Sequence, residues 1–342
     1  MKTLETERLT LRKFREDDFA DVQSYASRAD NIVYMQWGPN TEEQTRSFIR
    51  RAIARAEESP CTSYQYAAVA RDPGRLIGAC ELSAPEDAAG GVGWILHRDF
   101  WKQGFGAEMG RAMLTLGFDE LGLRRITARC DAENAGSYRV MEKIGMRREG
   151  LFLEARPAHK LSNRAYGDEL RYAILKDEWD TLREIAHYNT LPVQFNGFIE
   201  VPELADGVIY LVCTSKEKGN PEKKWVPGYH FAVCRGGEKI GMIDLRIGYT
   251  DGLYYGGQIG YGIDEGHRGN GYAARACRLL LPVARAHGMR KLFITNDESN
   301  AASRRVCEKL GARLLRAARL PEWHDLYREG RRFSNIFEWS VE

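Results

Sequence analysis

The feature that most constrains the fold is an internal repeat. Three short motifs occur in the same order in each half of the 342-residue chain. They pair as Gln103 to Gly106 with Asn270 to Ala273, Asn134 to Ser137 with Asn300 to Ser303, and Glu142 to Gly145 with Glu308 to Gly311. The spacing between partners changes only from 270 − 103 = 167 to 300 − 134 = 166. A constant order with a slightly drifting spacing indicates two copies of one structural unit that differ by small loop changes.

The repeat divides the chain into two predicted domains, because 342 residues exceed one ordinary core at roughly 100 to 200 residues per domain. A helical pattern around Trp179 is broken at Asn189 to Pro192. We therefore expect a first domain over 1–180, a linker over 181–194 and a second, shorter domain over 195–342. Each copy reads strand, strand, glycine-rich turn, helix, strand, helix, strand. This order predicts a mixed α/β class of the α+β type.

The composition excludes several classes of function. Apolar residues make up 43% of the chain, and no run approaches the ~20 apolar residues of a membrane-spanning helix. The formal net charge of +2 gives no field that would attract nucleic acid. The seven cysteines form no CxxC pair, and the seven histidines show no HExxH spacing. We expect a cytoplasmic protein with no metal, no membrane partner and no nucleic-acid partner.

The glycine-rich turn of each repeat is the clearest chemical signal. A turn that opens a helix leaves backbone N–H groups without partners, and the helix dipole adds partial positive charge there. Gly104 and Gly271 would let the backbone approach a phosphate, while Gly106 and Ala273 keep the first helical turn small. One such motif is equally consistent with a plain helix start. Its occurrence twice, with the same motifs downstream, favours a phosphate-binding turn in each half.

These turns resemble the coenzyme A motif of the GNAT acetyltransferase superfamily, [R/Q]-x-x-G-x-[G/A]. The run Arg268 to Ala273 fits it fully, and Trp101 to Gly106 fits except that Trp101 replaces Arg or Gln. The first half, from Glu7 to Trp179, resembles the ribosomal-protein N-terminal acetyltransferase branch. The resemblance implies two GNAT-like domains, each a mixed, mostly antiparallel sheet flanked by helices. It also implies a V-shaped splay between the fourth and fifth strands, and acetyl-CoA as co-substrate.

The resemblance further implies which residues contact the coenzyme. In the first half these are Leu96, His97, Gln103, Gly104, Phe105, Gly106, Ala107 and Asn134. In the second half they are Ile263, Arg268, Gly269, Asn270, Gly271, Tyr272, Ala273 and Asn300. For Asn134 and Asn300 an equally good interpretation is that they cap the following helix.

The catalytic residues are less completely specified. The tyrosine that many relatives use as an acid is replaced by Met141 and Cys307, while Ser137 and Ser303 match the serine that serves as acid in the ribosomal-protein branch. Each serine is also suited to satisfying backbone donors at a helix start. Glu81 is the best available general base, although strand alternation also allows it to lie on a solvated face.

The two halves differ in their predicted acceptor walls. Residues 15–62 of the first half contain two helical patterns and an aromatic link, in which Tyr34 and Trp37 are candidate acceptor contacts, although such aromatics often pack in a core. The second half has no comparable segment. We therefore expect the first half to transfer an acetyl group to a primary amine, either a small molecule or a protein N-terminus. The alternative is an acyl-CoA-binding or interaction protein in which one or both domains are non-catalytic. Monomer and homodimer both stay open.

Overall fold

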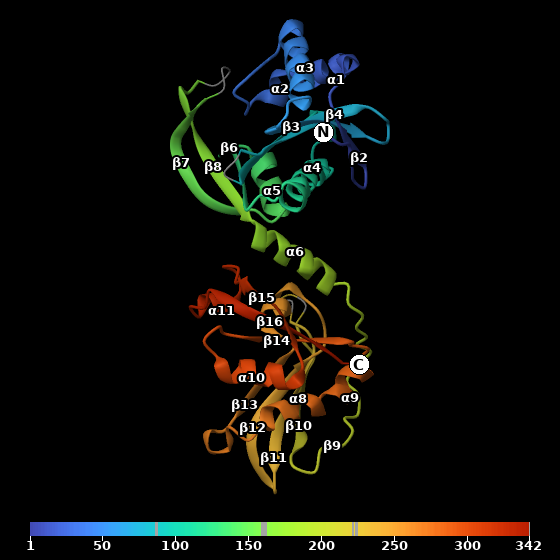
Figure 1. Cartoon of the computed structure of the whole chain (residues 1–342), viewed down its shortest axis with the longest axis vertical. Helices are drawn as coiled ribbons and strands as arrows, with labels where there is room; N and C mark the ends of the chain where they lie inside the picture. The colour runs from blue at the N-terminus through green and yellow to red at the C-terminus, as the bar shows by residue number, and fades with distance from the viewer. Residues whose placement is uncertain (86–87, 159–162, 221, 223–224, 342) are drawn as a thin grey trace. The chain divides into compact units, whose positions relative to one another are not determined.

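The computed structural model describes residues 1–85, 88–158, 163–220, 222 and 225–341 (Figure 1). The chain forms two compact units, Met1–Trp179 and Asp180–Glu342. Helix α6 (Lys176–Tyr188) runs across this boundary and into the predicted linker, 181–194. We retain the predicted limits, 1–180 and 195–342, as a proposal.

The first unit is built on one eight-stranded sheet in the order β1-β2-β3-β4-β5-β6-β8-β7. Its strands are β1 (Leu4–Glu5), β2 (Leu9–Arg12), β3 (Ser63–Ala70), β4 (Leu76–Ser83), β5 (Ala89–Leu96), β6 (Arg125–Asp131), β7 (Arg147–Pro157) and β8 (Tyr166–Leu175). Its helices are α1 (Phe19–Ala26), α2 (Ala29–Ile32), α3 (Glu42–Ala56), α4 (Phe105–Thr115) and α5 (Ala135–Lys143). Neighbouring strands are antiparallel except for β5 and β6, which are parallel.

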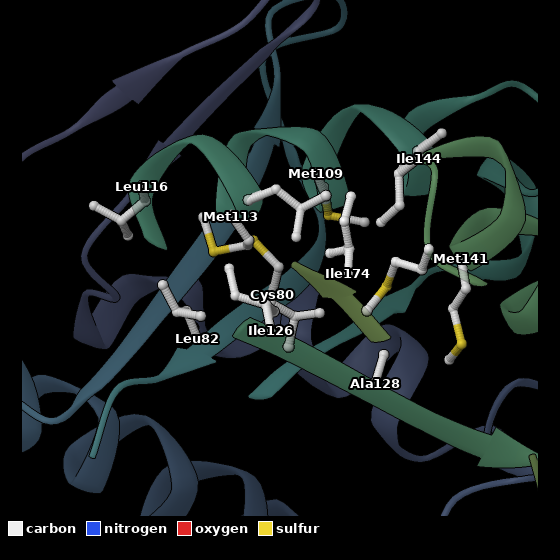
Figure 2. Close-up of a cluster of buried hydrophobic side chains, with 14 of the residues drawn as sticks. Cys80, Leu82, Met109, Met113, Leu116, Ile126, Ala128, Met141, Ile144 and Ile174 are labelled. Carbon is white, nitrogen blue, oxygen red and sulfur yellow. The ribbon is translucent and has the colours of Figure 1, made fainter. Parts of the chain in front are cut away.

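Alternate residues of the strands build two cores on opposite faces of this sheet, because successive side chains of a strand point to opposite sides. On β3, Tyr66 lies in the core shared with α4 and α5, whereas Ala67 lies in the core shared with α1 and α3. Figure 2 shows the first of these cores, with Met109 and Met113 of α4 over Cys80 of β4. Both faces of the sheet are therefore covered by helices.

The second unit has two sheets, in the orders β13-β12-β11-β10-β9 and β14-β16-β15. Its strands are β9 (Leu204–Ala205), β10 (Tyr210–Glu217), β11 (Gly228–Arg235), β12 (Glu238–Arg246), β13 (Ile259–Ile263), β14 (Lys291–Asn296), β15 (Arg313–Arg319) and β16 (Phe333–Ser340). Its helices are α7 (Asp251–Gly256), α8 (Tyr272–Leu279), α9 (Leu281–Ala286), α10 (Ala301–Leu310) and α11 (Asp325–Arg328). Strand β10 ends at Glu217 and β11 begins at Gly228, whereas α1, α2 and α3 lie between β2 and β3 of the first unit.

The two central strands of each unit diverge, as the family resemblance implied. In the first unit β5 and β6 pair only over Ala89 to Gly91, and the remainder of β5 has no ladder with β6. In the second unit β13 and β14 belong to different sheets. They are joined at their base by Gln258, whose backbone N–H donates to the Phe293 carbonyl at 2.8 Å and whose Oε1 accepts from Phe293 N–H at 2.7 Å. The predicted fold class and its splay are confirmed.

The helices give no indication of a membrane span. No helix within the described part of the chain combines the length and apolar character needed to cross a bilayer. The same residues contain no group of three or more His, Cys, Asp or Glu side chains that could hold a metal ion.

Candidate active site

The glycine-rich turn of the second unit leaves open space at the start of α8. Gly269 and Gly271 have φ values of +83° and +78°, a region that favours glycine. A Cβ added at either position would meet no atom within 4 Å. Gly271 is the N-cap of α8 and offers no side-chain acceptor. The first amides of α8 consequently have no intrahelical partner, and the helix dipole makes this point favourable for an anion.

The first unit repeats this backbone geometry, but a Cβ added at Gly104 would lie 3.3 Å from Arg8 Nη2. Gly104 is the N-cap of α4 with φ +89°, again without a side-chain cap. Lys102 occupies the position of Gly269, since 269 − 102 = 167, and has φ +61°. The Arg8 guanidinium lies beside this turn, because its Nη1 donates to the Gln103 carbonyl at 2.9 Å. Both predicted turns therefore have the conformation that a phosphate-binding helix start requires, but the first holds a lysine in a left-handed conformation.

The departure of the first turn from the family motif has a structural explanation. Arg268 Nε donates to the Ile263 carbonyl at 2.9 Å, which ties the turn to the end of β13. Trp101 Nε1 donates to the Leu96 carbonyl, the equivalent atom at the end of β5, at 2.8 Å. The indole thus makes the same hydrogen bond as the guanidinium it replaces.

Several predicted coenzyme contacts have side chains that are buried or hydrogen-bonded within the protein. Phe105, Ala107 and Tyr272 are buried, with 7%, 2% and 7% of their surface exposed. Gln103 Nε2 donates to the Asp99 carbonyl at 2.9 Å, and Asn270 Nδ2 donates to the His267 carbonyl at 3.1 Å. These side chains brace the core or the preceding turn, which leaves the helix-start amides as the candidate ligands.

His97 is likewise engaged within the protein. Its side chain is buried, and Nδ1 accepts a hydrogen bond from the Asp99 amide at 3.2 Å. Burial lowers the pKa of His97, although the nearby Asp99 opposes this. His97 is therefore a neutral imidazole that caps the 3-10 turn Arg98–Phe100.

In each unit an ion pair joins the first hairpin, β1–β2 or β9–β10, to the helix that starts at the glycine turn. The acid and the base have opposite positions in the two units. In the first unit Arg8 Nη2 lies 2.7 Å from a Glu108 oxygen on α4. In the second unit Arg275 of α8 lies 2.7 Å from Asp206, and 275 − 108 = 167. Glu108 also accepts a hydrogen bond from Thr6 at 2.6 Å. The acid and the base have exchanged sides between the copies, while the connection is kept.

A pocket of about 430 Å³ adjoins the turn of the second unit. It is lined by Asp206, Gly271, Ala274, Arg275, Arg278, Leu279 and Lys309. The equivalents of its three cations in the first unit are Glu108, Arg111 and Lys143, so one cation there is replaced by an acid. Because Arg8 beside the first turn takes the place of Asp206 beside the second, the two turns keep the same balance of charges. Sequence reasoning missed this cluster, because its members come from two helices.

Asn134 caps α5, which follows β6, and Asn300 caps α10, which follows β14. Asn134 Oδ1 accepts from the Ser137 amide, and Asn300 Oδ1 accepts from the Ser303 amide, both at 3.0 Å. The capping interpretation is thus present in the structure for both residues. Their predicted contact with the coenzyme stays a prediction.

The two candidate serines have different partners. The Ser137 side chain lies beside the Cys130 thiol, whose pKa burial raises to about 11. Ser303 Oγ lies 2.9 Å from the Tyr261 hydroxyl. Burial raises the pKa of Tyr261 well above its ordinary value, so this hydroxyl keeps its proton at neutral pH. Tyr261 was missed by sequence reasoning. The available signal was that Tyr261 occupies the position in the second repeat that Trp94 occupies in the first.

The predicted base, Glu81, lies on an exposed part of β4. Its Oε2 accepts from Gln65 Nε2 at 3.2 Å, and the carboxylate stands over Gly93 of β5, where a Cβ would lie 3.4 Å from Oε1. Asp244 is the counterpart in the second unit. It stands over Gly260, and burial raises its pKa although Arg246, 3.0 Å away, opposes this. An acid over a glycine beside the splay is therefore common to both units.

The acceptor side is covered in the first unit and open in the second. Trp37 is 36% exposed, and the Tyr34 carbonyl accepts from Arg156 Nη2 at 2.8 Å, which joins this link to the end of β7. The corresponding face of the five-stranded sheet in the second unit exposes the side chains of Val212 and Met242, with exposed fractions of 45% and 56%. The structure places Tyr34 and Trp37 on the link between α2 and α3, as the sequence indicated.

Comparison with known proteins gives a consistent result. The sequence model of a family described as an acetyltransferase (GNAT) domain matches residues 8–147 and 206–313. One matched range lies in each compact unit.

Individual relatives are half the length of this chain. "Uncharacterized N-acetyltransferase YnaD" of Bacillus subtilis (strain 168) is 35% identical over 177 residues, 51% of this chain and 98% of the relative. "Uncharacterized N-acetyltransferase p20" of Bacillus licheniformis is 29% identical over 182 residues, 52% of this chain and 99% of the relative. A solved GNAT-family acetyltransferase from Bacillus anthracis is 33% identical, covers 52% of this chain and 99% of its own, and has a TM-score of 0.45.

Proposed function

The chain belongs to the GNAT acetyltransferase family and is an N-acetyltransferase, and we propose that it moves the acetyl group of acetyl-CoA to a primary amine. The observation that carries the proposal is the pair of helices, α4 and α8, that start uncapped at left-handed glycines beside splayed strands. Such a start supplies free amides and a favourable dipole for a pyrophosphate. The acceptor is a small molecule or a protein N-terminus.

Backbone amides would hold the coenzyme in this proposal. They belong to Phe105, Gly106 and Ala107 in the first unit and to Tyr272, Ala273 and Ala274 in the second. Arg275, Arg278 and Lys309 would add positive charge for phosphate groups in the second unit. The open space at Gly269 and Gly271 fits a group that approaches the backbone closely. Asn134 and Asn300 remain candidates for a further polar contact.

The coenzyme supplies an acetyl group activated as a thioester. The chain's own residues then handle protons, because an amine with a pKa near 10 is mostly protonated at neutral pH. Glu81 is the proposed proton acceptor in the first unit, on the face of β4 that carries Ala79 and the acceptor-side core. The Ser137 hydroxyl is the proposed proton donor for the leaving sulfur. In the second unit Ser303 and Tyr261 form the equivalent donor pair.

We assign acetyl transfer to the first unit. Its acceptor face is walled by α1, α2 and α3, and Tyr34 and Trp37 are the proposed acceptor contacts. The open face of the second unit favours a second candidate role for that half, coenzyme binding without turnover.

The test is release of coenzyme A from acetyl-CoA by purified protein offered a panel of primary amines. Acceptor-dependent release from the full chain supports the proposal, and Glu81→Gln should reduce it because the amide cannot accept the proton. Binding of acetyl-CoA without release for any amine would replace the proposal by the second role for both units. Absence of binding would reject both.

A further inference from the structure

An incompletely satisfied arginine lies at the acceptor side of the first unit. The Arg156 side chain, near the end of β7, is only 10% exposed. Its Nη2 donates to the Tyr34 carbonyl at 2.8 Å. Its Nε is buried and has no hydrogen-bond acceptor among the residues that the structure describes. A guanidinium is always charged and carries five N–H donors, so a buried donor without an acceptor is costly and calls for an explanation.

The neighbouring acid does not supply the missing acceptor. Asp131, at the end of β6, approaches Arg156 Nη1 with Oδ2 at 3.9 Å, which is too long for a hydrogen bond. Its side chain is 17% exposed. Glu169 is buried, but its Oε1 accepts from Arg171 Nε at 2.7 Å. The positive charge of Arg156 is therefore partly balanced while its Nε–H stays unsatisfied.

Arg156 is close to the proposed transfer chemistry. Its Nη1 lies 3.9 Å from Asp131 at the end of β6, and the Asn134 cap of the helix that carries Ser137 follows three residues later. Through the Tyr34 carbonyl Arg156 also contacts the link that carries both predicted acceptor residues. The unsatisfied donor is thus linked to the strand end that precedes Ser137 on one side and to the acceptor wall on the other.

We propose that Arg156 binds a carboxylate of the acceptor, so that the first unit acetylates amines that carry a carboxylate group, such as amino acids and short peptides. Nε and Nη2 form one edge of the guanidinium, and Nη2 has a second hydrogen besides the one directed at Tyr34. This edge matches the two oxygens of a carboxylate. A singly charged group suits the site better than a phosphate, because Asp131 and Glu169 would repel a dianion. The inference rests on the proposed function.

The test uses pairs of acceptors that differ only in the carboxylate. Glycine, β-alanine, γ-aminobutyrate and glycylglycine are each compared with the corresponding carboxamide. We expect wild-type kcat/KM to favour the carboxylate of at least one pair, and Arg156→Gln to reduce that preference by about tenfold or more. The readout is the ratio of carboxylate to carboxamide kcat/KM, because loss of the Tyr34 hydrogen bond would lower the rate for both members of a pair alike. Arg156→Lys should retain part of the preference, because it keeps the charge but loses the paired donors.

Two results would overturn the inference. One is a wild-type protein that shows no preference for any carboxylate. The other is an equal loss for both members of a pair in Arg156→Gln, which indicates that Arg156 only holds the Tyr34 link. If no amine is acetylated, the proposed function fails separately, and calorimetric titration of the same carboxylates decides the inference. Binding by wild type that Arg156→Gln abolishes supports it, and no binding by wild type rejects it.

Discussion

At the scale of single residues, Ser137 is where structural and catalytic roles separate most cleanly. Its backbone amide completes the Asn134 cap, whereas its hydroxyl contacts the Cys130 thiol. Removal of the hydroxyl therefore leaves the helix cap intact. We expect Ser137→Ala to lower kcat by about 100-fold, as for loss of a general acid, with little change in acetyl-CoA affinity.

The measurement is steady-state kinetics together with calorimetric affinity for acetyl-CoA. Ser47→Ala is the matched control, because this hydroxyl on α3 only accepts a hydrogen bond from Arg51 at 2.7 Å. Equal losses in turnover and affinity for Ser137→Ala would show that the side chain is structural.

Lys102 and Gly269 offer a reciprocal test of backbone strain. Lys102 has φ +61° where its counterpart, Gly269, has φ +83°. A side chain in this region costs roughly 1–2 kcal/mol, partly offset because glycine is more disordered when unfolded. We expect Lys102→Gly to raise the free energy of unfolding by about 0.5 kcal/mol and Gly269→Lys to lower it by a similar amount. Chemical denaturation measures both, and a change of the same sign in the two variants would contradict the explanation.

Residue-level features were predictable where they are local in sequence. The repeat identified both glycine turns and both Asn caps because each motif is a short run whose conformation depends on its own residues. The Tyr261 to Ser303 hydrogen bond was not predictable, since it joins β13 to α10 across 42 positions. Nor does any run of the sequence show that Arg156 reaches the Tyr34 carbonyl. Such pairs depend on strand register and on loop paths that one chain does not reveal.

At the scale of elements, the hairpin-to-helix ion pair makes a pH-dependent contribution to stability. Burial of Glu108 acts to raise its pKa, but hydrogen bonds from Thr6 and from Arg8, with the charge of Arg8, hold the pKa below its ordinary value. A carboxylate with a lowered pKa stabilises the folded state above its unfolded pKa, about 4.3, and this contribution is lost as pH falls through the folded value.

We expect Glu108→Gln to destabilise the first unit by roughly 1.5–3 kcal/mol at pH 7, because charge-assisted hydrogen bonds are lost. The difference from wild type should shrink as the pH is lowered below about 4.3. Thermal unfolding from pH 3 to pH 7 measures both effects. Glu57→Gln is the control, since its ion pair with Lys13 is exposed and should leave the midpoint unchanged. A difference that stays constant with pH would contradict the assignment.

The order of the helices and strands was predicted more fully than their exact limits and the hydrogen bonds around them. The repeat predicted strands, turn and helix in both halves, and the family resemblance implied the splay between the central strands. Helix α4 starts at Phe105, directly after Gly104, which takes the left-handed N-cap conformation. Trp101 is the one departure of the first turn from the motif, and its indole makes the hydrogen bond that Arg268 makes in the second unit.

At the scale of the whole molecule, the decisive property is how many coenzymes one chain binds. Both units have an uncapped helix start at a left-handed glycine, so we expect two acetyl-CoA molecules per chain by calorimetry. A stoichiometry of one acetyl-CoA per chain would indicate that one unit does not bind the coenzyme.

Glycine variants assign each site to its unit. Gly104→Val and Gly271→Val should each remove one equivalent, because a branched side chain blocks close approach to the helix-start amides. Valine in a left-handed conformation also strains the backbone, so Gly122→Val and Gly311→Val are the controls, with φ values of +67° and +75° and no atom within 4 Å of an added Cβ. Loss of binding in a control as well would attribute the effect to strain. Loss only in Gly104→Val, together with loss of coenzyme A release, would place both binding and transfer in the first unit and leave the second without a coenzyme role.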